Sequence, residues 1–315
     1  MKTILFLLML VQVAYAQTAE PMAFTTAEGV VLGGTLTLPK DLSRPVRVVL
    51  LIAGSGPTDR DCNSGSQLKS NAYAMLADSL TRMGVAVLRY DKRGSGQNIP
   101  AVMKQLKPEN HRFDFYINDA VGFIKQLQAD KRFNNVFVAG HSEGSLVGMI
   151  AARQTNATGF ISLAGAGRNI ADILKVQLGR GQSPEVQRYV NVRLDSLRAG
   201  QRVQSVTPGL MTIMNPPMQP AMISWMKYDP AVEISQFKGP VLLIQGKRDV
   251  QVAVSEAELL QKARPDAQLV YFDLMNHILK EAPEAFMANI QTYTEPSRPL
   301  LKGVADAIAD FVKKK

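Results

Sequence analysis

The chain has 315 residues, of which 46% are hydrophobic and 7% aromatic, a composition typical of a globular protein with a substantial core. Its formal charge is +9, but apart from three lysines at 313–315 the basic residues are dispersed and do not alternate with aromatic residues. These features disfavour a nucleic-acid-binding protein and allow only a weak attraction to acidic envelope surfaces.

The first sixteen residues differ from the rest of the chain. Lys2 precedes a mostly apolar stretch at 4–14, and the tripeptide AYA at 14–16 offers a small-x-small cleavage pattern. This predicts a secretory signal peptide over residues 1–16, whose removal lowers the charge from +9 to +8 because Lys2 leaves. The apolar stretch is too short to span a bilayer comfortably, and no later stretch approaches a membrane span. We therefore expect an exported protein, periplasmic or extracellular, without stable membrane insertion.

Beyond the signal peptide, residues 17–315 show the hydrophobic pattern of alternating strands and helices. Strands made almost entirely of Val, Ile and Leu and joined through helices predict an α/β domain, with a mostly parallel sheet covered by helices on both faces. In chain order the expected elements are a hairpin at 23–38, a strand at 47–54, a helix at 71–84, a strand at 85–90, a helix at about 112–129, a strand at 135–140, a helix after residue 142, strands at 159–165 and 240–246, a helix near 253–263, a strand at 267–273 and a helix near 299–312.

The interval of about 167–236 contains no convincing strand and is predicted to be a helical cap inserted over one end of the sheet. Its second half carries five methionines beside the only tryptophan, Trp225. Flexible thioether side chains can adapt to varied apolar ligands, although methionines at near-helical spacing are also typical of plain packing. From this segment we expect Met214, Met218 and Trp225 to bind substrate.

Residues 136–150, with the sequence VFVAGHSEGSLVGMI, interrupt an apolar strand and helix with a G-x-S-x-G motif. Such a turn holds its serine on a sharp elbow above the sheet, and its two glycines supply the space. The motif alone is weak, since glycine and serine are common residues. Its position between a buried strand and a buried helix predicts that Ser142 is a nucleophile.

A serine hydroxyl needs a histidine base to become an effective nucleophile, and the base needs a carboxylate to orient it. The chain has three histidines. His141 lies beside the nucleophile with its side chain expected to point elsewhere, and His111 precedes a helix with no carboxylate-bearing loop. His277 follows the last predicted strand at the carboxyl edge of the sheet, so it is the predicted base.

The predicted acid is Asp249, which also follows the carboxyl end of a buried strand. The resulting order, Ser142, Asp249 and His277, is one in which a serine triad is known to occur. Asp273 and Asp229 are the alternatives, but Asp273 belongs to the end of a strand and Asp229 to the insertion.

Acyl transfer also requires backbone donors for the developing oxyanion. One is expected to be the N–H of Glu143, at the N-terminus of the helix that follows the nucleophile. The other is expected from the glycine-rich loop after the strand at 47–54, where the N–H of Ser55 is the first choice and that of Gly56 the alternative.

The carboxylate of Glu143 would oppose a developing oxyanion unless it is turned away and paired. We expect Arg60 to be its partner, because the loop that carries Arg60 begins at the second oxyanion donor. The alternative is that Arg60 pairs only with Asp59 or Asp61. The charged run at 91–93 is expected to hold a strand-end loop together rather than to touch substrate.

The chain resembles the α/β-hydrolase superfamily, specifically its serine-aminopeptidase-like branch and the small bacterial carboxylesterases with a GHSEG elbow, in five segments: GSGPTDRDCN (54–63), RYDKRGSGQ (89–97), GHSEGS (140–145), QGKRDVQV (245–252) and MNHILK (275–280). The resemblance covers nearly the whole mature chain. It implies the α/β-hydrolase fold, the triad Ser142, Asp249 and His277, and esterase activity on short acyl esters. The relatives usually carry glycine where this chain has Cys62, its sole cysteine, which we interpret as an incidental loop residue.

The sequence therefore predicts a serine hydrolase, specifically a carboxylesterase that cleaves small acyl esters through an acyl-enzyme on Ser142 and needs no metal or cofactor. A peptidase or thioesterase is the nearest alternative, because the first step of acyl transfer is the same for all three. A non-catalytic protein that binds envelope polymers is a further alternative.

Overall fold

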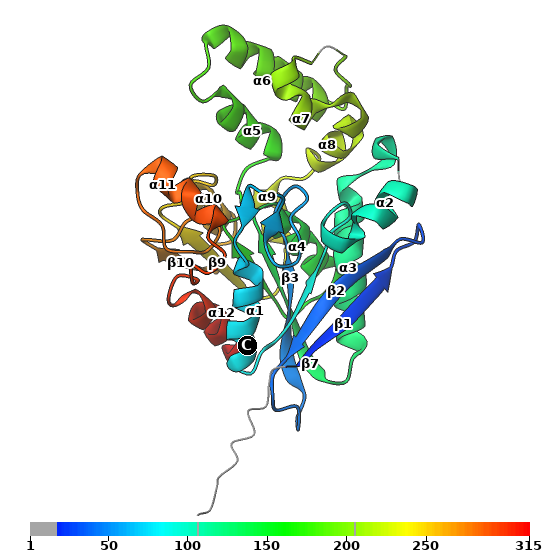
Figure 1. Cartoon of the computed structure of the whole chain (residues 1–315), viewed down its shortest axis with the longest axis vertical. Coiled ribbons are helices and arrows are strands. Elements are labelled where there is room, and N and C mark those ends of the chain that lie inside the picture. Colours follow the sequence, from blue (N-terminus) through cyan, green and yellow to red (C-terminus); the bar gives the residue numbers. More distant parts are fainter. Residues whose placement is uncertain (1–17, 106, 205) are drawn as a thin grey trace, which may run out of the picture.

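The computed structural model describes residues 18–105, 107–204 and 206–315 (Figure 1). The predicted signal peptide at 1–16 lies outside the described residues. Within the described ranges, no helix combines the length and the apolar character that a membrane crossing requires.

The centre of the molecule is an eight-stranded sheet in the order β1-β2-β6-β3-β7-β8-β9-β10. Strand β2 pairs antiparallel with β1 and β6, and the remaining neighbours pair in parallel. The predicted mostly parallel sheet is therefore confirmed. The strands are β1 (Thr18–Thr25), β2 (Val31–Leu38), β3 (Val46–Ile52), β6 (Ala86–Tyr90), β7 (Phe133–His141), β8 (Gly159–Leu163), β9 (Val241–Gly246) and β10 (Gln268–Phe272).

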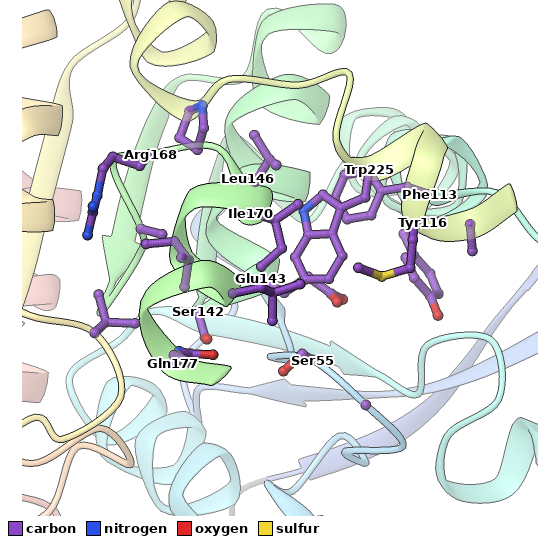
Figure 2. Close-up of a pocket in the computed structure, with 18 of the residues that line it drawn as sticks. Ser55, Phe113, Tyr116, Ser142, Glu143, Leu146, Arg168, Ile170, Gln177 and Trp225 are labelled. Carbon is purple, nitrogen blue, oxygen red and sulfur yellow. The ribbon is translucent and has the colours of Figure 1, made fainter. Parts of the chain in front are cut away.

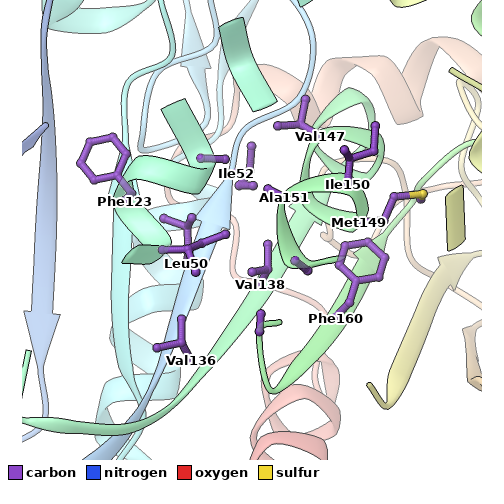
Figure 3. Packing of buried hydrophobic residues seen from close by; sticks show 14 of the residues in the cluster. Leu50, Ile52, Phe123, Val136, Val138, Val147, Met149, Ile150, Ala151 and Phe160 are labelled. Carbon is purple, nitrogen blue, oxygen red and sulfur yellow. The ribbon is translucent and has the colours of Figure 1, made fainter. Parts of the chain in front are cut away.

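Helices cover both faces of this sheet, and each face has its own hydrophobic cluster. Side chains alternate along β3, so that Leu50 and Ile52 enter one cluster while Val49 and Leu51 enter the other. The first cluster is packed by α3 (Phe113–Ala129), α4 (Glu143–Thr155), α9 (Pro230–Gln236) and α10 (Val254–Ala263), and the second by α1 (Ala72–Arg82) and α12 (Val304–Lys314). Figure 3 shows the first cluster, in which Leu50 and Ile52 lie between helices α3 and α4.

Four helices form a cap over the carboxyl ends of the strands (Figure 1). They are α5 (Ile170–Gly179), α6 (Pro184–Arg198), α7 (Met211–Met214) and α8 (Gln219–Trp225). The cap has its own small core of buried residues, namely Ala171, Leu174, Val190, Leu194, Leu197, Met214 and Met226. Helix α9, which falls inside the predicted insertion, instead packs against α4 and α10 and covers the sheet.

Several short elements were not expected from the hydrophobic pattern, because two to seven residues are too few to show a period. They are the strands β4 (Asn63–Ser64) and β5 (Leu68–Lys69), the helices α2 (Ile99–Gln105) and α11 (Phe286–Gln291), and the 3-10 turns η1 (Gly96–Asn98), η2 (Pro108–Asn110), η3 (Pro208–Leu210), η4 (Pro216–Met218) and η5 (Thr292–Thr294). The last helix also begins later than predicted, because Gly303 at its N-terminus has a φ of 93°.

Helix α4 approaches the sheet very closely because glycines occupy the contact. A Cβ at Gly140 would lie 2.0 Å from the carbonyl oxygen of Gly144, and a Cβ at Gly144 would lie 2.5 Å from that of Ile52. Neither distance is possible for real atoms, and backbone cannot move aside as a flexible side chain can. The two glycines of the G-x-S-x-G motif therefore determine how α4 sits on the sheet.

We predict that Gly144→Ala lowers the free energy of unfolding by at least about 2 kcal/mol, since the new methyl group collides with the backbone of β3. Gly209→Ala is the matched control, because a Cβ there meets nothing within 4 Å and should change stability little. Urea denaturation of both variants measures the difference. Equal midpoints for the two variants would contradict the account of the α4 contact.

Candidate active site

Ser142 lies at the turn between β7 and α4 in a strained backbone conformation, with φ 54° and ψ −119°. Its N–H donates to the carbonyl of Leu163 at the end of β8 (2.9 Å), and its own carbonyl accepts the N–H of Ser145 (3.0 Å). The backbone is thus fixed on both sides of the elbow. Ser142 lines a cavity beneath the cap.

The loop after β3 lies directly against this elbow. A Cβ at Gly54 would lie 3.1 Å from Nδ1 of His141 and 3.3 Å from Cβ of Ser142, so only glycine allows this approach without a shift. Ser55 and Glu143 line the same cavity as Ser142. In the described part of the chain, neither the Ser55 N–H nor the Glu143 N–H donates to a protein acceptor. Both amides are therefore free to bind a ligand oxygen.

Asp249 and His277 form a buried pair at the carboxyl ends of β9 and β10, with 2.7 Å between Oδ2 of Asp249 and Nδ1 of His277. The other carboxylate oxygen accepts the N–H groups of Gln251 (2.8 Å) and Val252 (2.9 Å). Burial alone would raise the pKa of Asp249, but His277 and these two N–H groups hold it below its ordinary value. Asp249 is therefore ionised at neutral pH and fixes the ring of His277.

The two alternative acids lie elsewhere. Asp273 forms an exposed ion pair with Lys247 (2.8 Å). Asp229 accepts the N–H of Ala231 at the start of α9 (3.0 Å) and caps that helix. Among the described residues, only Asp249 is bonded to His277 through a carboxylate.

Ser142 and His277 lie at the same edge of the sheet but are not hydrogen-bonded to each other in the described residues. The ring of His141, the residue before Ser142, lies 4.6 Å from the ring of His277, centroid to centroid. A bond between nucleophile and base is often long before substrate binds and tightens in the complex. Ser142, His277 and Asp249 therefore lie at the same edge of the sheet. The hydrogen bond between His277 and Asp249 is formed, whereas none joins Ser142 to His277 in the described residues.

The expected pairing of Glu143 with Arg60 is wrong. Lys92 forms the ion pair with Glu143, while Arg60 pairs with Asp91 (2.6 Å) rather than with either neighbouring aspartate. The reason is the path of the loop after β6, which brings Lys92 to the elbow and turns Asp91 toward Arg60. Both side chains of the Lys92 pair are almost completely buried, and the Lys92 ammonium lies 4.7 Å from the ring centroid of Tyr116.

The rest of the charged run at 91–93 is also buried and paired. Arg93 binds Asp119 of α3 through two hydrogen bonds of 2.7 Å each. The expectation that this run holds a strand-end loop together agrees with these contacts. Lys92 adds to it by reaching the residue next to the nucleophile, which the sequence pattern did not indicate.

The cavity has a volume of about 550 Å³ and lies between the elbow and the cap. Phe113 and Trp225 form much of its apolar wall, with their rings stacked at 5.3 Å and 2° between planes. Figure 2 shows Ser142 and Ser55 among the residues that line the cavity, together with Gln177 of cap helix α5.

Two of the three residues expected to bind substrate line the cavity, and the third does not. Met218 and Trp225 line the cavity, whereas Met214 does not. Met214 is completely buried in the core of the cap, so its assignment to substrate is corrected. Met222, eight residues after Met214, lines the cavity instead. Sequence spacing could not tell the two apart, since both faces of this segment are apolar.

His111 lines the cavity although it is far from the acid and the base in sequence. Burial, and then the positive charges of Arg93, Lys92 and Arg112, lower the pKa of His111 to about 4. The ring is therefore neutral at physiological pH. Sequence reasoning considered this residue only as a base and missed its place in the cavity wall.

Cys62 is buried and has a φ of 74°, a conformation that favours glycine. This explains why a glycine suits the same position in the proteins that the chain resembles. Burial raises the pKa of the Cys62 thiol to about 11, so it is not a reactive thiolate at neutral pH. No group of three or more potential metal ligands occurs in the described ranges.

The chain is similar to several known proteins in sequence and in fold. A family model described as serine aminopeptidase, S33, matches residues 63–208, which include Ser142 but not Asp249 or His277. Esterase EstD from Thermotoga maritima is 28% identical over 278 residues, which are 85% of this chain. The chain spans 64% of the length of that relative.

Solved esterase structures share the architecture over almost the whole chain. Est1E from Butyrivibrio proteoclasticus, solved with ferulic acid bound, aligns with a TM-score of 0.59 at 17% identity and covers 93% of this chain and 96% of its own. An esterase from Pyrococcus furiosus aligns with a TM-score of 0.57 at 16% identity and covers 95% of this chain and 91% of its own. The chain has the α/β-hydrolase fold. In this fold Ser142, Asp249 and His277 lie at the carboxyl edge of the parallel strands, where such sheets carry their sites.

The buried Lys92–Glu143 pair gives a testable consequence for stability. We predict that Lys92→Met lowers the free energy of unfolding by about 3–5 kcal/mol, because it leaves the Glu143 carboxylate buried and unpaired. The double variant Lys92→Met/Glu143→Gln should recover most of this loss, because it removes the buried charge. Urea denaturation at neutral pH measures both effects.

Lys247→Met is the control for removal of a lysine charge, since its pair with Asp273 is exposed and should contribute little. The account of the Lys92 pair would be contradicted if Lys92→Met were as stable as Lys247→Met, or if the double variant recovered nothing.

Proposed function

We propose that this α/β hydrolase is a serine carboxylesterase that cleaves small, short-chain acyl esters through an acyl-enzyme on Ser142. The observation that carries the proposal is the buried Asp249–His277 hydrogen bond of 2.7 Å at the same sheet edge as a serine held on a strained elbow. These are the three roles that nucleophilic acyl transfer requires, namely a nucleophile, a base and a group that orients the base.

The reaction follows from the positions of these groups. Because Asp249 holds Nδ1 of His277, the other ring nitrogen accepts the proton from the Ser142 hydroxyl as its oxygen attacks the ester carbonyl. The N–H groups of Ser55 and Glu143 bind the oxyanion. The protonated ring of His277 then gives its proton to the leaving alcohol, and water releases the acyl group by the same steps.

The Lys92–Glu143 pair supports this chemistry through electrostatics. An unpaired carboxylate beside the oxyanion would raise the energy of the transition state. The Lys92 ammonium neutralises the Glu143 charge, so the N–H of Glu143 can act as a donor without repulsion from its own side chain.

The cavity supports a small substrate with an apolar portion. Its volume is about 550 Å³, and Met218, Met222 and Trp225 of the cap line it. We therefore assign Met218 and Trp225 to substrate binding. The likeness to Esterase EstD from Thermotoga maritima supports ester hydrolysis, and the match to the serine aminopeptidase, S33, model keeps a peptidase as the second candidate.

An aminopeptidase needs a carboxylate that binds the amino group of its substrate. Glu143 is the one carboxylate among the described residues that line the cavity, and Lys92 already neutralises it. This favours an ester over a peptide. A thioester shares the first step with an ester and remains an alternative leaving-group chemistry.

The test is hydrolysis of p-nitrophenyl acetate, butyrate and octanoate, with aminoacyl-p-nitroanilides in parallel. We expect turnover of the short esters, a preference for acetate or butyrate over octanoate, and no activity in Ser142→Ala. We expect Asp249→Asn to lower kcat about 10⁴-fold, because the base loses its orienting group.

Turnover of anilides with little ester activity would instead indicate a peptidase. No turnover, together with no labelling by a fluorophosphonate, would indicate a non-catalytic binding protein of the same fold. Labelling that occurs in the wild type and disappears in Ser142→Ala would exclude that alternative.

We further propose that the protein acts outside the cytoplasm, in the periplasm or the medium, after removal of residues 1–16. The support is the charged, apolar and small-residue pattern of this segment. N-terminal sequencing of the protein recovered from the producing cells should begin at Gln17, and a cytoplasmic protein with an intact N-terminus would contradict the proposal.

A further inference from the structure

The ring of His141 is buried beside the catalytic groups and has a partner at each nitrogen. Nδ1 lies 2.7 Å from the hydroxyl oxygen of Tyr73, and Nε2 lies 2.7 Å from the backbone carbonyl oxygen of His277. The same Tyr73 oxygen accepts the N–H of Gly54 (3.2 Å). A continuous chain of hydrogen bonds therefore runs from Gly54 through Tyr73 and His141 to His277.

We propose that Tyr73 and His141 are positioning residues for the reaction, because their hydrogen-bond chain fixes the loop of the base relative to the loop of the oxyanion donor. The proposal rests on the proposed function for its effect on turnover. Tyr73 and His141 would thus belong to the site although neither lines the cavity nor touches the scissile bond.

The direction of every bond in this chain is determined. A carbonyl oxygen only accepts, so Nε2 of His141 carries the proton that it shares with His277. Burial, and then the neighbouring His277, lower the pKa of His141 to about 3, so the ring is neutral and Nδ1 has no proton. Tyr73 must donate to Nδ1, and its oxygen keeps a lone pair for the Gly54 N–H.

The chain of hydrogen bonds connects three segments that take part in the proposed acyl transfer. Gly54 precedes Ser55, His141 precedes Ser142, and His277 is the base itself. His141 and His277 are 136 residues apart in sequence, so this contact is tertiary and does not follow from either loop alone. Misplacement of a catalytic group by about 1 Å can lower the rate on the order of 10²-fold.

The same positions cannot be explained by packing alone. An apolar side chain at 141 would remove the donor to the His277 carbonyl and the acceptor of the Tyr73 hydroxyl proton, and would leave the Tyr73 oxygen with only the Gly54 N–H. The chemistry of the side chain at 141 also matters. Only a residue that donates at one end and accepts at the other can bond both the His277 carbonyl and the Tyr73 hydroxyl. Histidine in its Nε2–H form meets this requirement.

The first experiment compares Tyr73→Phe with Thr81→Val in ester hydrolysis. Both changes remove one buried hydroxyl from α1, but the Thr81 hydroxyl bonds only the Ala77 carbonyl within the helix (2.6 Å). We expect Tyr73→Phe to lower kcat about tenfold or more with little change in KM, and Thr81→Val to change neither. Equal kinetics for the two variants at matched fold stability would overturn the proposal.

Substitutions at 141 test the hydrogen bond to the His277 carbonyl. His141→Gln keeps an amide donor near the His277 carbonyl, whereas His141→Leu keeps neither bond. We expect His141→Gln to retain several times the kcat of His141→Leu, with similar KM values. A His141→Leu variant that folds and turns over ester as fast as His141→Gln would contradict a positioning role.

A readout that does not depend on turnover separates this proposal from the proposed function. Nitrogen-15 NMR of the histidine rings, with His141 assigned from the signal lost in His141→Gln, reports its tautomer directly. We expect the neutral Nε2–H form at pH 7 in the wild type. An Nδ1–H or charged ring would overturn the proposed hydrogen-bond chain even if the protein is an active esterase. The expected tautomer in a protein without ester turnover would instead overturn the proposed function.

Discussion

The close contact between α4 and the sheet is the constraint on which the site depends. Gly140 and Gly144 let the helix backbone lie almost on β3 and β7, and this approach forces the chain at Ser142 into its strained turn. The strain is sustained because backbone hydrogen bonds to Leu163 and Ser145 hold the turn from both sides. The position of Ser142 at the cavity is thus a consequence of helix packing.

Buried charges around this turn are matched in pairs. Lys92 neutralises Glu143, and Asp249 is paired with His277 while two backbone N–H groups bind its second oxygen. Two buried histidines near these groups, His111 in the cavity wall and His141 beside His277, are held neutral chiefly by burial. The result is a site in which ionised groups have fixed partners, and Ser55 and Glu143, which carry the two free N–H groups, line the cavity.

Much of this arrangement was predictable from sequence, because it depends on local pattern. Eight strands follow from apolar runs that end in glycine or a loop signal, and Ser142 follows from a motif placed between a strand and a helix. The positions of Asp249 and His277 follow from the rule that parallel strands present their carboxyl ends at one edge. Asp249 and His277 are 28 residues apart, yet their pairing could be predicted without knowledge of side-chain positions.

The errors arose where the answer depended on the path of a loop or on the rotation of a short helix. Arg60 and Lys92 both follow the carboxyl ends of the neighbouring strands β3 and β6, and only the folded loops decide which one reaches Glu143. Met214 and Met222 lie on one apolar segment, and the packing of the cap turns one inward and the other toward the cavity. Tyr73 and His141 give no sequence signal, because their partners come from distant loops.

The most direct test of the account is a crystal structure of the protein after reaction with a small alkyl phosphonate. The account predicts a covalent bond from phosphorus to the Ser142 oxygen, with the phosphoryl oxygen about 2.7–3.1 Å from the nitrogens of both Ser55 and Glu143. It also predicts that the Nε2 of His277 lies within hydrogen-bond distance of the adduct. An adduct on another residue, or a phosphoryl oxygen that points away from both amides, would contradict it.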